Sequence, residues 1–406
     1  MGVYSMKKKK KWLKFRHKIV RSLAYWVLYP YSVIKYGIKI DKFKEQGNKQ
    51  YLILFNHQTA FDQFFVGCSF KGPVYYVASE DLFSKGWVSA LIRFIVAPIP
   101  IKKQSTDVSA VMNCIRVAKE GGTIAMAPEG NRTYSGATGY MNPAIAPLAR
   151  KLKLPIAIYR IEGGYGVHPR WSDVVRKGKM HSYVSRVIEP EEYASLTNEQ
   201  LYELITNELY IDESNADACF KSDKKAEYLE RAMYVCPFCG LSEFVSEGNE
   251  IECKKCHKKI EYGENKTLRG IGFDFPFNFV KQWYDYQCDF INTLDIMQWC
   301  DTPLYRDTAN ISQIFVYKGR KLLFENAALS LYGDRVMIDA PDGTTLNLSF
   351  DDISAVSVLG KNKLNVYYKD KLYQFKSDKR FNALKYVNIY FRYKNRGDEN
   401  DKFLGL

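Results

Sequence analysis

The sequence predicts an α/β domain with a mixed sheet flanked by helices, then a small cysteine-rich ribbon and a β-rich C-terminal domain with a closing helix. Three observations support this fold class. Short apolar runs alternate with helical periods over residues 41–210, which is typical of a sheet with helices on its faces. Two CxxC pairs follow residue 232, and from about residue 310 the apolar period changes to two.

The N-terminal segment, residues 1–40, is basic and then apolar. It holds eleven Lys or Arg and no Asp or Glu, so only +3 of the net charge of +14 belongs to the other 366 residues. Residues 19–34 are apolar and aromatic and contain Pro30, and this stretch is shorter than the roughly 20 residues that a spanning helix needs. We therefore expect a basic amphipathic helix at a membrane interface, broken at Pro30, with its lysines on anionic lipid. The aromatic side chains expected at headgroup depth are Tyr25, Trp26, Tyr29 and Tyr31. The alternative is a disordered basic tail followed by a core helix.

Charge and cysteine usage indicate the compartment and the class of partner. Because the basic charge is confined to one segment, no nucleic acid is expected as a partner. The nine cysteines form no regular framework, which favours a reducing compartment. No small-residue cleavage site follows the apolar stretch. We expect a peripheral or monotopic protein on the cytoplasmic face of the membrane.

The elements of the α/β domain are expected in a regular order. Gly121 and Gly122 end a helix after residue 120. The expected strands are residues 51–55, 74–78, 123–127 and 155–161, and the expected helices are residues 108–120 and 143–152.

Two polar motifs directly follow two of these strands. Asn56-His57-Gln-Thr-Ala-Phe-Asp62 follows the first, and this edge is where open α/β sheets place ligands. A His with a carboxylate at short reach can act as a general base whose tautomer and cationic form the carboxylate holds. Taken alone, such a pair is weak evidence, because an ordinary surface pair has the same pattern.

The second motif follows the strand at residues 123–127 and contains Glu129, Gly130, Asn131, Arg132 and Thr133. Gly130 permits a tight turn. Arg132 offers a bidentate fork for a phosphate monoester, and Thr133 and the backbone amides can add hydrogen bonds. A turn with an Arg on the surface is the plainer alternative.

Together the two motifs resemble those of the 1-acylglycerol-3-phosphate acyltransferase family, which has an NHxSxxD-like and an EGTRS-like motif. His57 and Glu129 are 72 residues apart, a separation that suits the family. Two further blocks are similar: residues 97–103, ending in Lys102-Lys103, and residues 154–158. The resemblance covers roughly residues 40 to 190. Thr59, Asn131 and Thr133 depart from the usual Ser, Thr and Ser, and Lys102-Lys103 replaces an Asp-Arg-like ending.

The resemblance implies direct acyl transfer with no catalytic cofactor. His57 would deprotonate the acceptor hydroxyl, Asp62 would orient His57, and the second motif would hold the glycerol phosphate, with Lys103 assisting. The implied donor is acyl-CoA or acyl-carrier protein, and the implied acceptor is a lysophospholipid, 1-acylglycerol-3-phosphate above all, giving phosphatidic acid. Another lysolipid acceptor and a non-enzymatic, membrane-anchored adaptor remain as alternatives.

Residues 232–262 are predicted to form a zinc ribbon. Cys236 and Cys239 are separated by thirteen residues from Cys253 and Cys256, and four thiolates at this spacing suit a tetrahedral structural zinc. His257 follows the last cysteine and could compete as a ligand, but an all-cysteine site is simpler.

The rest of the chain is divided by composition. Residues 211–231 are polar and are expected to be a linker or a solvated helix, and residues 263–309 form an aromatic, partly helical connector. Residues 310–395 contain seven short alternating runs and an amphipathic helix, and they resemble a pleckstrin-homology (PH)-like β-barrel with a closing helix. The seven expected strands are residues 314–317, 329–332, 335–338, 345–348, 355–358, 363–368 and 372–375.

Overall fold

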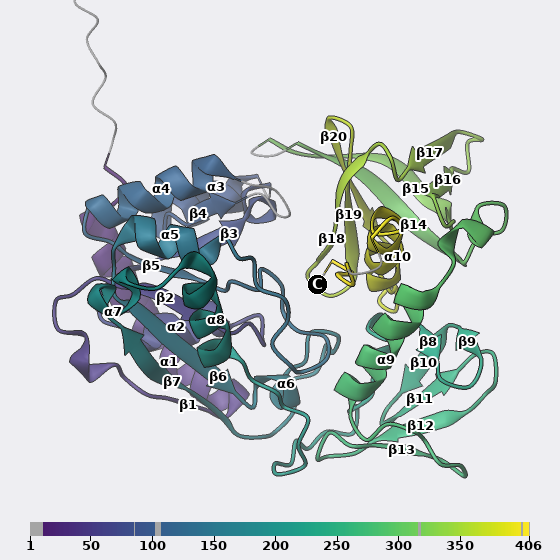
Figure 1. The fold of residues 1–406 in the computed structure, drawn as a ribbon, viewed down its shortest axis with the longest axis horizontal. Coiled ribbons are helices and arrows are strands. Elements are labelled where there is room, and N and C mark those ends of the chain that lie inside the picture. The colour runs from purple at the N-terminus through teal and green to yellow at the C-terminus, as the bar shows by residue number, and fades with distance from the viewer. Residues whose placement is uncertain (1–10, 85, 102–106, 316–317, 399–400, 406) are drawn as a thin grey trace, which may run out of the picture.

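The protein is described by a computed structural model that covers residues 11–84, 86–101, 107–315, 318–398 and 401–405 (Figure 1). An α/β domain forms the N-terminal half. A small four-stranded sheet, the long helix α9 (Val280–Thr293) and a second seven-stranded sheet with helix α10 (Leu384–Lys394) form the C-terminal half.

The sheet of the α/β domain has seven strands in the order β1-β7-β6-β2-β5-β3-β4. Neighbouring strands are parallel except for β6 and β7, so the predicted mixed sheet is confirmed. The strands are β1 (Ile38–Ile40), β2 (Leu52–Phe55), β3 (Val74–Ser79), β4 (Ile99–Ile101), β5 (Thr123–Met126), β6 (Ile156–Glu162) and β7 (Met180–Ile188). The helices are α1 (Phe15–Tyr36), α2 (Asp62–Ser69), α3 (Trp87–Ile95), α4 (Val108–Lys119), α5 (Ile145–Leu152), α6 (Gly164–Val167), α7 (Pro190–Ala194) and α8 (Asn198–Leu209). The chain also has short 3-10 helices at Lys44–Gln46, Glu80–Phe83, Leu229–Arg231 and Ile296–Trp299.

Alternation along the central strands gives the sheet two separate cores. Leu52 and Leu54 of β2 face the core under α4, α5 and α8, whereas Ile53 and Phe55 face the core under α1 and α2. Successive strand residues point to opposite faces, so a strand buried on both sides reads as a continuous apolar run. This is why the four predicted strands of the domain were recognisable.

Helix α1 is longer and more continuous than expected. It runs through Pro30, which lies on the exposed side, where the backbone carbonyl freed by the missing N–H can reach solvent. It ends at Gly37, whose φ of 60° and close approach to the Gly178 carbonyl favour glycine. Tyr25 and Tyr29 are half-buried and pack against the core, whereas Trp26 is 77% exposed.

No helix in the described ranges has both the length and the apolar character needed to cross a membrane.

The C-terminal half shares one continuous core with loops of the α/β domain. Tyr134, Tyr165 and Trp171 of the α/β domain belong to the same buried cluster as the cysteine-containing sheet, α9 and the C-terminal sheet. Ala226 and Leu229 are fully buried in this cluster, so residues 211–231 are not the solvated linker that their polar composition predicts. The Ala226 N–H donates to the carbonyl of Gly248, which attaches the segment to the ribbon.

The ribbon and the C-terminal domain extend beyond their predicted limits. The four-stranded sheet comprises β10 (Phe244–Glu247), β11 (Glu250–Cys253), β12 (Lys259–Tyr262) and β13 (Leu268–Gly270), preceded by the hairpin of β8 (Val235–Cys236) and β9 (Gly240–Leu241). The second sheet has the order β17-β16-β15-β14-β20-β19-β18. Its strands are β14 (Tyr305–Phe315), β15 (Gly319–Leu331), β16 (Arg335–Asp339), β17 (Thr345–Ser349), β18 (Ile353–Leu359), β19 (Lys363–Tyr368) and β20 (Lys371–Lys376). β14 therefore begins inside the predicted connector at 263–309.

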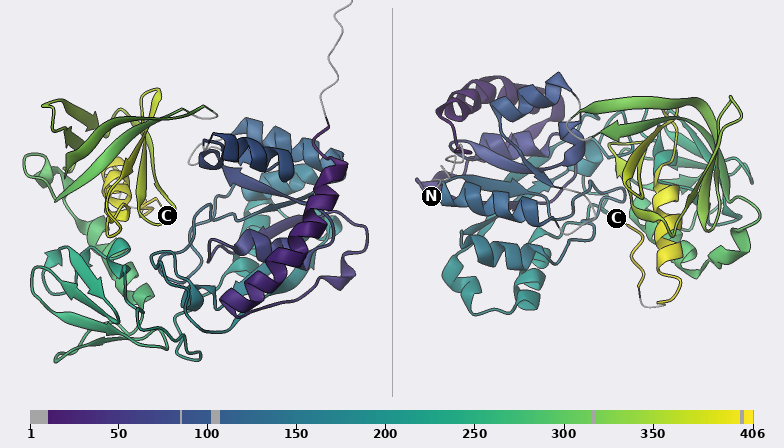
Figure 2. Two further views of the ribbon diagram at one scale, coloured as in Figure 1. Left: turned by 180° about the vertical axis from the view of Figure 1, so that it is seen from behind. Right: turned by 90° about the horizontal axis from the view of Figure 1, so that it is seen from above.

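The predicted barrel is not closed. β17 and β18 are the two edges of the C-terminal sheet, and no hydrogen-bonded pairing joins them among the described residues. Instead, α10 packs against β18 with buried Leu384, Val387 and Tyr390. The helix thus covers apolar surface that a closed barrel would enclose. Figure 2 shows the sheet curved around this helix.

Candidate active site

The two predicted motifs meet at one edge of the α/β sheet. β2 and β5 are parallel neighbours, so the loops that follow Phe55 and Met126 leave the sheet at the same edge. The Asn56 side chain fixes the first loop by pairing with both the N–H and the carbonyl of Ile161 in β6, at 2.8 and 2.9 Å. The Thr133 N–H donates to the His57 carbonyl at 3.1 Å and joins the two loops.

His57 and Asp62 form a hydrogen-bonded pair. The His57 Nδ1 lies 2.8 Å from Asp62 Oδ2. Asp62 is fully buried at the start of α2, and its carboxylate also accepts from the backbone N–H of Gln58 and Thr59 and from the Thr59 hydroxyl, at 2.6 to 3.0 Å. A carboxylate surrounded by donors is held in its ionised, accepting form. Nδ1 of His57 therefore carries the hydrogen, and Nε2 presents a lone pair.

The protonation state of His57 suits a base. Burial lowers the pKa of His57 below its usual 6.5, the bond to Asp62 opposes this shift, and the positive charge of Arg132 adds to it. His57 is therefore neutral at pH 7. The His57 side chain remains 24% exposed, so a small molecule can reach the ring.

Glu129 braces the site instead of facing a ligand. Its Oε1 accepts from the His57 N–H at 2.7 Å, and its Oε2 accepts from the Gly139 N–H at 2.9 Å. Both oxygens are thus engaged by backbone amides, which departs from the predicted contact with the glycerol phosphate. Burial raises the pKa of Glu129 to about 8, and the two N–H groups oppose this shift.

Arg132 has the properties of an anion ligand. Its guanidinium makes no ion pair with a described residue, and its Nη1 is buried without a hydrogen-bond partner. Burial, followed by the charge of Arg170, lowers the pKa of Arg132 to about 10, so it is still a cation at pH 7. An unpaired buried cation is costly, and an anionic ligand would compensate its charge.

The other residues of the second motif have mixed positions. Gly130 has φ of 65° with open space around it, so its role is to form the turn. The Thr133 hydroxyl accepts from the N–H groups of Ser135 and Gly136 and is 7% exposed, so it stabilises the loop. Asn131 is half-buried beside Arg132 and lines a small cavity with it. Lys103 lies outside the described residues.

Three residues that sequence reasoning missed approach this site. Arg170 is 2% exposed and donates to the Arg132 carbonyl at 2.9 Å. His168 is 7% exposed, and its ring lies 5.9 Å from that of Tyr36 at the end of α1. Lys361 lies in the turn between β18 and β19. None belongs to a motif, so only the fold could identify them.

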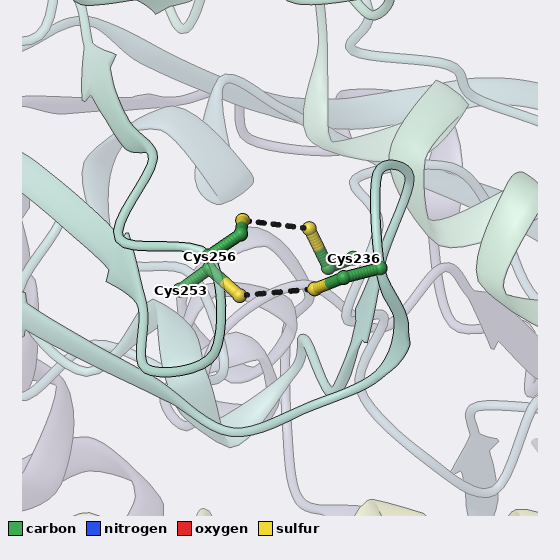
Figure 3. A group of neighbouring side chains, drawn as sticks. Cys236, Cys253 and Cys256 are labelled. Carbon is green, nitrogen blue, oxygen red and sulfur yellow. Dashed lines mark hydrogen bonds between the residues drawn. The ribbon is translucent and has the colours of Figure 1, made fainter.

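The four predicted metal ligands converge (Figure 3). Cys236 and Cys239 lie on the β8–β9 hairpin, and Cys253 and Cys256 lie at the end of β11 and in the turn after it. All four sulfur atoms lie within 4.8 Å of one another. The sulfurs of Cys236 and Cys256 are 3.7 Å apart, and those of Cys239 and Cys253 are 3.6 Å apart. Figure 3 labels Cys236, Cys253 and Cys256 of this group.

This geometry suits a tetrahedral metal. Zinc–sulfur bonds of about 2.3 Å place the corners of a tetrahedron about 3.8 Å apart, close to the two sulfur–sulfur distances of 3.7 and 3.6 Å. The His257 ring is not with the sulfurs, because it pairs with Glu252 at 2.9 Å and is 74% exposed. The Ser242 hydroxyl, 3.0 Å from Cys253 Sγ, can support one thiolate from outside the ligand set.

Comparison with known families agrees with the site. Residues 38–161 match the family model described as Acyltransferase, and this range contains both motifs. Over these residues the chain is therefore similar to the acyltransferase family, as the motifs predict.

Individual relatives make the likeness more specific. The chain is similar to the 1-acyl-sn-glycerol-3-phosphate acyltransferase of Bacillus subtilis (strain 168), with 21% identity over 136 residues, or 34% of this chain. The match spans 65% of that relative, which is less than two thirds of its length.

Two solved structures also show some likeness. The crystal structure of the 1-acyl-sn-glycerophosphate (LPA) acyltransferase PlsC from Thermotoga maritima has a TM-score of 0.40 and 18% identity, covering 47% of this chain and 75% of that chain. The Vps36 N-terminal PH domain has a TM-score of 0.20 and 17% identity, covering 23% of this chain and 80% of that chain. Because both TM-scores are below 0.5, we base no conclusion on these two structures.

Proposed function

We propose that this protein is an O-acyltransferase that moves a fatty acyl group from acyl-CoA or acyl-carrier protein to the free hydroxyl of 1-acylglycerol-3-phosphate, forming phosphatidic acid. The observation that carries the proposal is the His57–Asp62 pair, with Nδ1 held at 2.8 Å and Nε2 left as the accepting nitrogen. The unpaired Arg132 beside it supports an acceptor that carries phosphate. The name of the Bacillus subtilis relative supports the same acceptor.

The reaction follows from the roles of these groups. Nε2 of His57 takes the proton of the acceptor hydroxyl as that oxygen attacks the thioester carbonyl, so a C–O bond forms. The C–S bond then breaks, and the leaving thiolate takes the proton back from His57. Asp62 stabilises the imidazolium in between, because its carboxylate is ionised and in contact with Nδ1. Arg132 holds the phosphate and so fixes the hydroxyl near Nε2.

We propose that the enzyme acts at a membrane surface, on the cytoplasmic face, as a peripheral or monotopic protein. Large apolar side chains of α1 and α3 are exposed, and the two helices contact each other through Arg16, which donates to the Phe94 carbonyl at 2.8 Å. Such exposed apolar side chains on adjacent helices are typical of an interfacial surface. The most exposed members are Phe15, Leu23, Trp26, Val27, Ile34, Trp87 and Phe94. The flanking lysines would contact anionic lipid.

We further propose that the four cysteines hold one structural zinc ion and that the C-terminal sheet with α10 is a PH-like module. Four sulfurs within 4.8 Å of one another support the zinc, and with four thiolate ligands no position stays open for catalysis. The seven strands and the C-terminal helix packed against the sheet support the PH-like assignment.

The test is acyl transfer by the purified chain in detergent or vesicles, with 1-acylglycerol-3-phosphate and a long-chain acyl-CoA, beside His57→Ala. Product from the wild type and none from a folded His57→Ala variant is the expected result. A folded His57→Ala variant that transfers acyl groups at the wild-type rate would refute the assignment of His57 as the general base. If the wild type is inactive with this pair, acyl-carrier donors and other lysolipids follow, and inactivity with all of them favours the adaptor alternative.

A further inference from the structure

Two side chains, those of His168 and Arg132, have buried nitrogens without hydrogen-bond partners among the described residues. His168 follows α6, is 7% exposed, and neither ring nitrogen has a hydrogen-bond partner in the described part of the chain. The Nη1 of Arg132 is in the same condition. Burying such atoms unpaired is destabilising, and each therefore needs an explanation. A ligand that accepts hydrogen bonds from Arg132 and from the one N–H of the neutral His168 ring provides one.

The fold brings α6 next to the catalytic loop. The Tyr165 N–H donates to the Gln58 side chain at 2.8 Å, and a side chain at Gly164 would collide with Gln58 and Thr59. His168 follows one turn later and faces Tyr36. Burial, then the positive charges of Lys361 and Arg132, lower the pKa of His168 to about 3, so its ring is neutral at pH 7.

The C-terminal domain reaches this place through the β18–β19 turn. Arg170 bridges the two domains, because it donates to the carbonyls of Val358 and Gly360, both at 3.1 Å, and to that of Arg132 at 2.9 Å. The Tyr134 hydroxyl also lies 3.4 Å from the Lys361 carbonyl. The loops of the α/β domain that extend toward β18 and α10 can be followed in Figure 1.

Lys361 is the charged side chain of this turn. Its Nζ donates to Asp173 Oδ1 at 2.8 Å, and its side chain is 25% exposed. An ammonium group has three donors, so this bond does not exhaust it. Asp173 is also paired with Arg231, at 2.8 Å, and its charge is shared by two cations. Among the described residues, neither Arg132 nor Arg170 makes an ion pair, so two positive charges lack a carboxylate.

We propose that Arg132, His168 and Lys361 together bind the phosphate monoester of the acceptor, so that the C-terminal domain completes the acceptor site. This inference rests on the proposed function. A phosphate monoester carries about −1.5 to −2 charge at pH 7 and three accepting oxygens. A guanidinium supplies a fork, an ammonium a point charge and a neutral imidazole one N–H. Arg170 joins the backbone that carries Arg132 to the turn that carries Lys361.

A phosphate monoester also occurs in coenzyme A, so the donor is the competing source. The test measures KM for 1-acylglycerol-3-phosphate, for 1-acylglycerol, which lacks phosphate, and for acyl-CoA. The variants are Lys361→Met and, as a matched control from the same domain, Lys371→Met, which removes an exposed lysine from the β19–β20 hairpin. His168→Gln is the second test variant.

We expect Lys361→Met to raise KM for 1-acylglycerol-3-phosphate by roughly tenfold or more, the usual effect of losing one charge-assisted hydrogen bond. KM for 1-acylglycerol and for acyl-CoA should stay unchanged, and Lys371→Met should resemble the wild type. An equal rise in KM for 1-acylglycerol-3-phosphate and 1-acylglycerol would show that Lys361 only holds the two domains together, and it would overturn the proposal. A rise confined to acyl-CoA would assign the site to the donor and would also overturn it.

Binding without turnover separates this inference from the proposed function. Titration calorimetry of the full chain with glycerol 3-phosphate, and separately with adenosine 3′,5′-bisphosphate, needs no acyl transfer. Preferential binding of glycerol 3-phosphate, weakened by Lys361→Met and His168→Gln but not by Lys371→Met, supports the site even if every transfer assay is negative. Binding that neither test variant changes overturns the site while leaving an active enzyme intact.

Discussion

Replacing Asp62 with Asn removes one charge at nearly constant size and tests the centre of the proposed mechanism. The buried carboxylate accepts from His57 Nδ1, from two backbone N–H groups and from the Thr59 hydroxyl. An Asn side chain retains one accepting oxygen, and its NH2 group must face at least one of these donors. We expect the unfolding free energy to fall by about 1–3 kcal/mol, the cost of an unsatisfied buried polar group.

We expect Asp62→Asn to affect kcat more strongly than the free energy of unfolding. The contacts with Asp62 are what raise the pKa of His57 against burial and the charge of Arg132. Without the carboxylate, the imidazolium formed during proton transfer loses its counter-charge, and the amide can hold the ring in the wrong tautomer. We expect kcat to drop on the order of 10²–10⁴-fold, the range found when general-base machinery is damaged.

The assay follows thiol release from acyl-CoA and confirms phosphatidic acid by chromatography, with thermal unfolding as the check on folding. The chain offers a matched control in Asp41→Asn, because Asp41 Oδ2 pairs with His181 Nε2 at 2.7 Å but lies 42% exposed. This variant should keep wild-type kcat. If a folded Asp62→Asn protein also keeps wild-type kcat, or if both variants lose activity equally, the catalytic role proposed for His57 and Asp62 is refuted.

Three further results are expected. Because the pKa of His57 lies below 6.5, the neutral base persists at pH 7. We expect kcat/KM to decline only as the pH falls through that lower pKa. A decline of kcat/KM through His57 titration that starts above pH 7 would contradict the assignment. Glu129→Ala leaves the N–H groups of His57 and Gly139 without their acceptor and should cost about 1–3 kcal/mol in chemical denaturation, with a lower kcat because the His57 backbone loses its brace. Elemental analysis should find about one zinc per chain. The Cys253→Ser variant should lose the zinc and have a lower melting temperature. A wild-type protein that is fully folded without metal would refute the zinc proposal.

The catalytic loops could be predicted because their signals are local. The strand at Leu52–Phe55 is an uninterrupted apolar run, and a polar motif begins at the next residue. The strand Thr123–Met126 is likewise followed by a polar motif, which begins at Glu129 after Ala127 and Pro128. Chain order and parallel pairing then place both motifs at one edge of the sheet.

The contacts of the second motif could not be predicted in the same way. Glu129 accepts from the N–H groups of His57 in the first loop and of Gly139, and Thr133 accepts from that of Gly136. A residue type alone does not reveal which donors the fold brings to it. His168 and Lys361 are isolated residues whose position depends on contacts between segments 190 residues apart, such as Arg170 with Gly360.

The long β14–β15 hairpin was underestimated for a different reason. Much of β15 between Gly319 and Asn326 is exposed or half-buried, so no period-two pattern marks it. Strand prediction from alternation requires one face to be buried. Only the later part, around Ala327 to Leu331, contributes alternating residues to the core and was predicted.

The continuous core that joins residues 134 to 404 limits how this chain can be divided. Arg231 is 2% exposed, pairs with Asp173 of the α/β domain and donates to the Lys379 carbonyl near α10. A shortened chain ending near residue 210 would leave Tyr134, Tyr165 and Trp171 open to water, and its product would tend to aggregate instead of behaving as a free-standing enzyme. The ribbon and the C-terminal sheet are therefore poor candidates for exchange between proteins. We expect the α/β domain, the ribbon and the C-terminal sheet to be inherited together, and an engineered version of this protein should keep all three.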